Sequence, residues 1–351
     1  MKKILSASFL MLFALHSCNR PETTVVNFVR PDGSVLREIV MKHSGKNFSI
    51  SNVQVPYDTT WIITDTLEIN PEGDTLWVRR AEKLFRNFRE INEYYETDSS
   101  FNREEKRRVE FKKSFRWFNT AFRFAEIIKA RTKNGYPLSR FMEKSESEFF
   151  YSPESLKEKL LKGPDSLRYK AIEESVNSKT TEWIIRSFVA EWSELFSRMV
   201  KEKTSGAVVF DNLKSKEDSL YRYLDLKNKD TDSLWNSGVI LSFLVGEEYA
   251  SRFRAEADSA MNEVQEVLLR SFSNYTEKTF MPGRLTGTSG FADSTGYVLW
   301  PVKSEYFMTE PYVMWAESEK TNIWAWVITI ACALYFLYRL AIRRKGRAGR
   351  L

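Results

Sequence analysis

The sequence predicts an α+β protein with one C-terminal transmembrane helix. Segments in which apolar and polar residues alternate stand near both ends of the chain, and a long block of helical periodicity separates them. An uncharged stretch follows the last strand-like segments. We expect the last strands to pair with the first in one sheet or sandwich, which makes the helices a large insertion. The alternative is a β domain and a helical domain in tandem.

The expected regions follow these changes in periodicity. The chain has 351 residues and is 42% hydrophobic, which is enough for a buried core in one or two domains. The predicted regions are a signal peptide (1–17), a β region (18–79), a helical region (80–273), strands with a juxtamembrane linker (274–321), a transmembrane helix (322–342) and a basic tail (343–351).

The start of the chain has the layout of an export signal. Two lysines precede an apolar stretch (4–15) that is too short to span a bilayer. The residues that follow resemble the bacterial lipoprotein signal, because Leu15 and Ser17 match the places before the cysteine that carries lipid. His16 is larger than the usual residue. The resemblance implies a mature chain that begins at diacylated Cys18, and the alternative is an ordinary secretory signal.

The first strands are predicted from turn chemistry. Residues 24–41 form two alternating segments around Pro31-Asp32-Gly33, where proline fixes φ and glycine supplies a positive φ. Residues 47–55 and 60–69 are predicted as further strands. A second Pro/Gly turn precedes a returning strand at 75–78.

The middle of the chain has apolar residues at helical spacing. Helices are predicted at residues 80–95 and 103–130, the second with Phe111, Phe115 and Phe118 in one stripe. Basic residues between the stripes would also suit an interfacial membrane helix, although a core helix is favoured. Further helices are predicted at 138–150, from Ser152-Pro153 with serine as N-cap, after Gly163-Pro164, and at 180–200, 214–227 and 239–272.

The last part of the exported chain is predicted to return to strands. Glycines and a proline interrupt the pattern from residue 280 onward. Strands are predicted at 297–300, 306–309 and 312–315, and a short linker at 316–321.

The C-terminal segment predicts a membrane span. Residues 321–338 carry no charge, and a helix of that length nearly crosses a bilayer core. Arg339 lies close enough to the end for its guanidinium to reach the headgroups. A buried core helix would not explain the acid-free basic end. The predicted anchor residues are Trp324 and Trp326 at one interface, Tyr335, Tyr338 and Arg339 at the other, and Arg343, Arg344 and Lys345 beyond it.

These two ends together predict the location. The positive-inside rule places the C-terminus in the cytoplasm, while a lipid-bearing N-terminus lies outside. One span satisfies both. We therefore expect residues 19–321 in the periplasm, at the bacterial inner membrane, or outside the cell in a single-membrane bacterium.

The net charge of +6 does not indicate nucleic-acid binding. The tail from Arg339 onward carries six basic residues and the signal two, so 45 of the 53 basic residues remain against 47 acidic ones. The exported part therefore has no excess of positive charge that would attract a polyanion.

Few residues are available for nucleophilic or metal chemistry. Of two cysteines, Cys18 is the lipid site and Cys332 lies in the membrane helix, so the exported part has neither a disulfide nor a Cys/His zinc site. A Ser-His-Asp arrangement would depend on His43, the one histidine outside the signal, and a solvated turn histidine is the simpler interpretation.

Several ligand-binding motifs are incomplete in this sequence. The stretch Asn228-x-Asp230-x-Asp232 begins like a calcium loop but lacks the required glycine and final glutamate. The Gly-rich residues 283–296 lack the lysine of a P-loop and the spacing of a nucleophile elbow. Adjacent helical carboxylates such as Glu173 and Glu174 point about 100° apart and cannot act on one bond.

The order of elements resembles that of uncharacterised, membrane-anchored lipoproteins of Bacteroidota, and the resemblance implies a topology and no activity. We expect a non-enzymatic scaffold or subunit of an envelope complex. The alternatives are a binding module for an apolar ligand or lipid beside the membrane, and a carboxylate-dependent hydrolase such as a glycosidase. The expected partners are the lipid bilayer and an envelope protein. No catalytic residue, metal, cofactor, nucleotide or nucleic acid is predicted.

Overall fold

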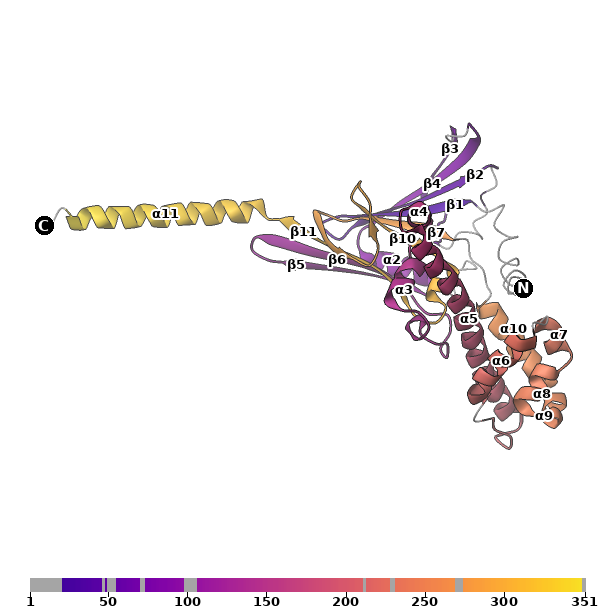
Figure 1. The fold of residues 1–351 in the computed structure, drawn as a ribbon. Helices are drawn as coiled ribbons and strands as arrows, with labels where there is room; N and C mark the ends of the chain where they lie inside the picture. The colour runs from indigo at the N-terminus through magenta and orange to yellow at the C-terminus, as the bar shows by residue number, and fades with distance from the viewer. Residues whose placement is uncertain are drawn as a thin grey trace.

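The computed structural model describes residues 21–45, 48, 55–69, 73–97, 106–210, 213–227, 231–268 and 274–348. The α+β prediction is confirmed: two sheets stand in the middle of the molecule, a helical insertion lies to one side, and a single long helix projects from the other (Figure 1). The signal residues Leu15, Ser17 and Cys18 lie outside the described residues, as do Asn228, Asp230 and most of the strand predicted at 47–55.

The larger sheet joins the two ends of the exported chain. The parallel pairing of β1 with β7, in which Thr23 aligns with Tyr275, confirms that late strands pair with early ones. The helices therefore form an insertion between β6 and β7. The order is β3-β4-β2-β1-β7-β10-β9, with β1 (Glu22–Val29), β2 (Val35–His43), β3 (Ile62–Ile69), β4 (Thr75–Phe85), β7 (Tyr275–Phe280), β9 (Phe291–Ala292) and β10 (Tyr297–Val302).

The smaller sheet leads to the C-terminal helix. Its central strand β11 pairs with β6 along ten residues and then continues into α11 (Ile323–Ala348) with one residue, Asn322, between them. The order is β5-β6-β11-β8, with β5 (Arg107–Phe115), β6 (Asn119–Ile128), β8 (Arg284–Thr288) and β11 (Tyr312–Thr321).

The helix predicted at 103–130 is wrong, and the helix predicted at 80–95 is correct only from Phe88 onward. Residues 75–85 form β4, only α2 (Phe88–Thr97) is helical, and β5 and β6 form a hairpin. The reason lies in β6, whose buried face carries the charged Glu126 and whose other face carries the apolar Ala125 and Ile127. Polar and apolar residues therefore do not alternate along this strand, and its aromatic residues match helical spacing by accident.

The insertion is helical, as predicted from residue 138 onward. Residues 138–150 are split into η4 (Leu138–Arg140) and α3 (Lys144–Phe150), and Pro153, not Ser152, occupies the N-cap of α4 (Glu154–Lys162). The 38-residue α5 (Ser166–Lys203) is its longest helix. The remaining helices are η5 (Leu213–Lys216), α6 (Glu217–Lys227), α7 (Thr231–Asn236), α8 (Val239–Val245), α9 (Glu247–Arg252) and α10 (Arg254–Leu268).

The helix predicted at 239–272 is broken into three pieces. Gly246 has φ +89°, a conformation that ends α8 and that L-residues rarely adopt, and the next break falls at Phe253. The breaks fold α8–α10 back along α5, where Trp192 and Phe196 stack in the core of the insertion.

Two predictions near the C-terminal strands are corrected. Residues 304–307 form the short helix η6 (Ser304–Phe307) in place of a strand at 306–309, because Tyr306 and Phe307 both turn into the core. The predicted linker at 316–321 is the second half of β11. Helix α11 also extends past residue 342 to Ala348, so the basic residues Arg343, Arg344 and Lys345 belong to its last turns.

Candidate functional site

Among the described residues, one helix is long and apolar enough to span a membrane. The segment Ile323–Leu340 of α11 is almost entirely unburied by the rest of the chain, and α11 stands clear of both sheets (Figure 1). Trp324 and Trp326 lie in its first turn, while the exposed side chains of Tyr335, Tyr338 and Arg339 follow three to four turns later. These residues therefore lie at the two ends of the apolar segment, and their role as membrane anchors stays a prediction.

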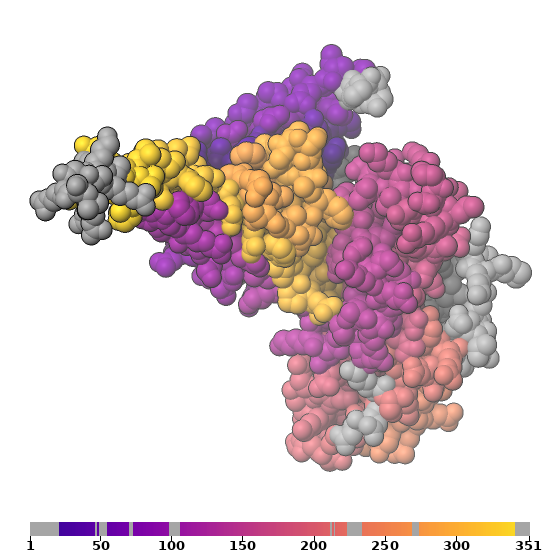
Figure 2. Space-filling view, turned by 60° about the vertical axis from the view of Figure 1, so that its left-hand side comes forward, coloured from indigo at the N-terminus to yellow at the C-terminus, as the bar shows by residue number. Residues whose placement is uncertain are grey.

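The tip of the β5–β6 hairpin packs against the first turns of α11. The two-residue turn Trp117-Phe118 is closed by hydrogen bonds between Arg116 and Asn119. Trp324 stacks on Phe115 with ring centroids 6.1 Å apart, and the centroid of Phe118 lies 4.3 Å from that of Trp326. We call these residues the aromatic collar: Phe115, Trp117, Phe118, Trp324 and Trp326. In the space-filling view the purple surface of β5–β6 lies against the yellow C-terminal segment (Figure 2).

Polar contacts fix the collar to the helix. Asn322 donates from its backbone N–H to Phe118 O at 2.8 Å and from its side-chain amide to Arg116 O at 2.9 Å. Trp117 Nε1 donates to Thr329 Oγ1 at 2.9 Å. Thr329 lies six residues into α11, or about 9 Å along the helix axis, so the Trp117 side chain reaches the second turn of the helix. The collar could not be predicted from the sequence analysis, because residues 103–130 were expected to form a helix and not a hairpin.

The outer edge of β3 is exposed on both faces. Ile62, Leu67 and Ile69 are 72%, 56% and 76% exposed, and β3–β4 protrudes from the larger sheet (Figures 1 and 2). No strand among the described residues pairs with this edge. The edge of β5, in contrast, is covered by α2, where Asn92 exchanges two hydrogen bonds with the backbone of Val109. Unpaired edge N–H and C=O groups on an apolar strand favour the addition of another strand.

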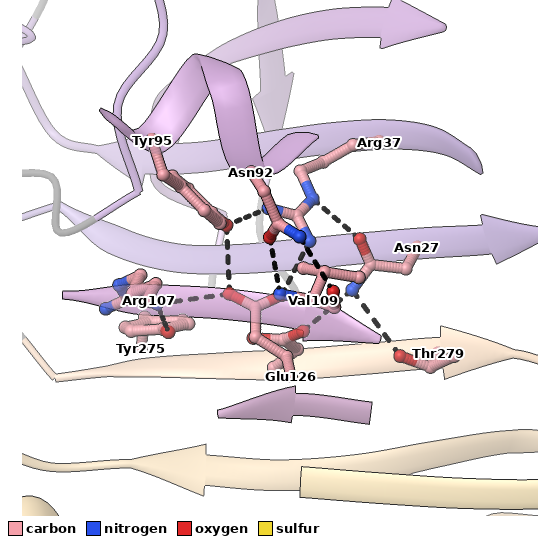
Figure 3. A network of polar contacts seen from close by, with 10 residues as sticks. Asn27, Arg37, Asn92, Tyr95, Arg107, Val109, Glu126, Tyr275 and Thr279 are labelled. Atoms are coloured by element: carbon pink, nitrogen blue, oxygen red, sulfur yellow. Dashed lines mark hydrogen bonds and ion pairs between the residues drawn. The ribbon is translucent and has the colours of Figure 1, made fainter. Parts of the chain in front are cut away.

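A buried ionic network joins the two sheets (Figure 3). Arg37 on β2 forms an ion pair with Glu126 on β6 at 2.6 Å, and both side chains are 1% exposed. The Nη1 of Arg107 on β5 lies 3.5 Å from Glu126 Oε1. Tyr95 on α2 donates to the same oxygen at 2.9 Å, and Arg37 also donates to Tyr95. The ion pair between Arg37 and Glu126 thus connects the larger sheet to the smaller one.

A second carboxyl group adjoins this pair from β7. Glu277 accepts a hydrogen bond from Asn27 at 2.7 Å, and Asn27 in turn accepts one from Arg37 Nε at 2.7 Å. Burial, followed by the charge of Glu126, raises the pKa of Glu277 from 4.5 to about 8. Burial opposes ionisation of Glu126 too, but the charges of Arg37 and Arg107 outweigh it and lower the pKa of Glu126. At neutral pH Glu126 is ionised and Glu277 is protonated.

Two facing acids with separated pKa values are the arrangement that a hydrolase would use. Glu126 and Glu277, however, are 0% and 1% exposed, and they lie between the sheets with no opening for a substrate among the described residues. The arrangement therefore acts as a joint between sheets. His43 makes a local contact with Gly45, and no cluster of three or more His, Cys, Asp or Glu side chains in the described part could hold a metal ion.

Replacement of Glu277 by glutamine should remove a pH dependence of stability. Between about pH 4.5 and 8 the folded protein retains the Glu277 proton that the unfolded chain has released, so rising pH lowers the free energy of unfolding. This contribution is present in full below about 4.5 and lost above about 8. Urea denaturation of wild type and Glu277→Gln at several pH values should give a flatter profile for the variant. Parallel profiles would contradict the raised pKa.

The sequence offered a signal for this network. Val35, Arg37 and Ile39 alternate on one face of β2, and the two apolar members are fully buried. A charged residue at a core-facing position of a strand needs a partner. The partner itself was not predictable, because Glu126 lies 89 residues further on, in a segment expected to be helical.

Comparisons with known proteins give little to identify the chain. No family model matches it, and no curated protein matches. It is similar to the folded domain of the Mycobacterium tuberculosis protein LppM, solved by NMR, with 9% identity over 87% of this chain and 92% of that one. The TM-score of 0.27 is too low for that likeness to support any statement about function.

Proposed function

We propose that this protein is a non-enzymatic, membrane-anchored scaffold or subunit of a bacterial envelope complex. In this proposal α11 crosses the inner membrane, the exported domain lies on its outer side, and lipid on Cys18 attaches the other end of the domain. The observation that carries the proposal is the exposed apolar edge of β3. It lies far from α11, at the opposite end of the sheets, where it can meet a partner away from the bilayer (Figure 1).

The partner that fits this edge is an extended segment of another protein. On one face of β3, Ile63, Leu67 and Ile69 are exposed, with Asp65 between them. Asp65 is held by Arg79, whose Nε and Nη2 both donate to it at 2.8 Å. The added strand would therefore carry apolar side chains opposite the three apolar residues and a side chain opposite Asp65 that is not acidic.

A second copy of this chain fits the edge less well. Two copies of β3 related by a two-fold axis would pair as antiparallel strands. Paired residues must point to the same face of the sheet, so the axis must pass beside one residue, which then pairs with itself. An axis at Asp65 would set two acids directly opposite each other. An axis at Thr66 would set each Asp65 against Leu67 of the other copy. An axis at Thr64 would leave Leu67 and Ile69 without a partner.

Photo-crosslinking from β3 tests this proposal. A photoreactive amino acid at Ile69 of the full-length protein should give, in intact cells, an adduct with one defined envelope protein. Leu67→Lys should reduce that adduct roughly fivefold or more, because it places a charge in an apolar contact worth about 1 kcal/mol or more.

The matched control uses Leu167, which is 83% exposed on α5, a helix of the insertion that is not part of the larger sheet. Leu167→Lys should leave the adduct from position 69 unchanged, and a photoreactive residue at 167 should not yield it. An adduct of two copies of this chain would overturn the partner proposal in favour of a homodimer. An adduct insensitive to Leu67→Lys would show that β3 is not the docking edge.

A further inference from the structure

An open groove lies where the smaller sheet meets α11. Its volume is about 380 Å³, and its floor is formed by Thr120 and Phe122 on β6. Lys113 on β5 and Lys320 on β11 flank the floor, and Asn322 and Trp324 close the end toward α11. We call this the junction groove. Its position ties it to the aromatic collar, because Trp324 belongs to both.

Strand register places the two lysines on opposite sides of the floor. Lys113 pairs with Phe122 across β5–β6, and Lys320 pairs with Thr120 across β6–β11. Side chains at paired positions share a face, so both ammonium groups rise on the same side of the sheet. Their strands lie two spacings apart, roughly 10 Å. One compact anion between the lysines would therefore be within reach of both.

The charge of the groove is positive. None of the described residues that line it is acidic. Glu319 on β11 is engaged outside it, 3.5 Å from the Nη1 of Arg116 and in contact with Asn119. Lys113 donates one hydrogen bond to Pro31 O at 3.0 Å, which leaves two of its three donors for a ligand.

The groove also lies at the depth of lipid headgroups, on the proposed function's premise that α11 crosses the membrane. Span residues begin at Ile323, directly after the groove, and the collar tryptophans occupy the interfacial position that this side chain prefers. The side chain of Trp117, at the hairpin tip, reaches Thr329, which lies about 9 Å further along α11 and toward the acyl chains. A molecule in the groove would have its polar part beside the lysines and an apolar part beside the collar.

We propose that the junction groove binds the headgroup of an anionic phospholipid of the bilayer that α11 enters. The phosphodiester lies between Lys113 and Lys320, and the acyl chains run down past Phe115 and Trp324. A zwitterionic headgroup would bring its ammonium group close to two lysines and is disfavoured. Bound in this way, the lipid would fix the angle between the exported domain and the membrane, because the groove spans the joint between the two.

The test is lipid retention by the full-length protein. The protein is reconstituted in nanodiscs of phosphatidylglycerol and phosphatidylcholine and extracted with mild detergent, and the retained lipids are counted by native mass spectrometry. We expect wild type to retain phosphatidylglycerol selectively. The double variant Lys113→Gln/Lys320→Gln should lose roughly ten- to thirtyfold in that selectivity, because each basic group near the membrane surface contributes about 1 kcal/mol, or roughly fivefold at most.

The matched control is Lys112→Gln/Lys129→Gln, which removes the same charge from exposed positions outside the groove. It should retain the wild-type selectivity. Equal loss in both double variants would overturn the groove site in favour of general surface charge. Displacement of the lipid by inorganic phosphate at equal concentration would assign the site to free phosphate.

This experiment separates the groove from the proposed function. If wild type failed to enter nanodiscs at all, membrane anchoring by α11 would be wrong. If it entered but retained both lipids equally, only the groove proposal would fail. The edge of β3 plays no part in either measurement, so the scaffold proposal would still rest on its own crosslinking test.

Discussion

Glu126→Gln is expected to lower the free energy of unfolding by about 3–5 kcal/mol. The substitution keeps the shape of the side chain but removes the negative charge that faces Arg37 and Arg107 inside the protein. Both guanidinium groups then stay buried with less compensation, and removing one partner of a buried ion pair costs far more than the pair itself contributes. Urea denaturation of the full-length protein in detergent, followed by tryptophan fluorescence, measures this loss.

The loss in Glu126→Gln should depend on pH, because Glu277 can ionise in the variant. Its proton is retained partly because Glu126 is charged, so Glu126→Gln should lower the pKa of Glu277 and let it take over as counter-ion. Glu126→Gln should therefore lose least at high pH. The double variant Glu126→Gln/Glu277→Gln has no second carboxyl group that could ionise. Its free energy of unfolding should therefore fall by more than the sum of the losses in the two single variants.

An exposed ion pair of the same type provides the control. Glu317 pairs with Arg123 at 2.5 Å between β11 and β6, and the two side chains are 42% and 45% exposed. Glu317→Gln should change the free energy of unfolding by about 1 kcal/mol or less. Similar losses in the free energy of unfolding for Glu126→Gln and Glu317→Gln would contradict the conclusion that a buried ion pair connects the two sheets.

The elements that the sequence predicted well are those with a local signal. The β1–β2 hairpin follows from Pro31-Asp32-Gly33, in which Gly33 has φ +90°. Helix α11 follows from an uncharged run long enough to cross a bilayer. The pairing of late strands with early ones followed from economy of connection, and β1–β7 confirms it.

The elements that were missed depend on contacts between distant residues. Strand β6 carries the charged Glu126 on its buried face and the apolar Ala125 and Ile127 on its other face, so its polar and apolar residues do not alternate. The contact between Asn27 and Glu277 spans 250 residues, and that between Trp117 and Thr329 spans 212. A pattern of neighbouring residues cannot contain either pair. The ionic network and the collar could therefore be identified only from the three-dimensional structure.

Gly283→Ala is the other substitution with a large expected effect, about 2–4 kcal/mol of lost stability. Gly283 has φ +89° and lies in the turn between β7 and β8. A Cβ at this position would lie 2.4 Å from Glu319 O and 3.1 Å from Lys320 Cα. Both are backbone atoms of β11, which is held by β6 on one side and β8 on the other, so neither can move without breaking sheet hydrogen bonds.

Gly73→Ala isolates the part of this cost that comes from steric contact. Gly73 has nearly the same conformation, φ +91°, but a Cβ there would meet no atom within 4 Å. It should therefore cost only the conformational strain of a positive φ, about 1–2 kcal/mol. The difference between the two variants in urea denaturation measures how firmly β11 is held. Equal losses of stability would mean that β11 shifts to make room for the added Cβ. Because β11 continues directly into α11, the connection between the smaller sheet and α11 would then not be rigid, contrary to what the collar contacts imply.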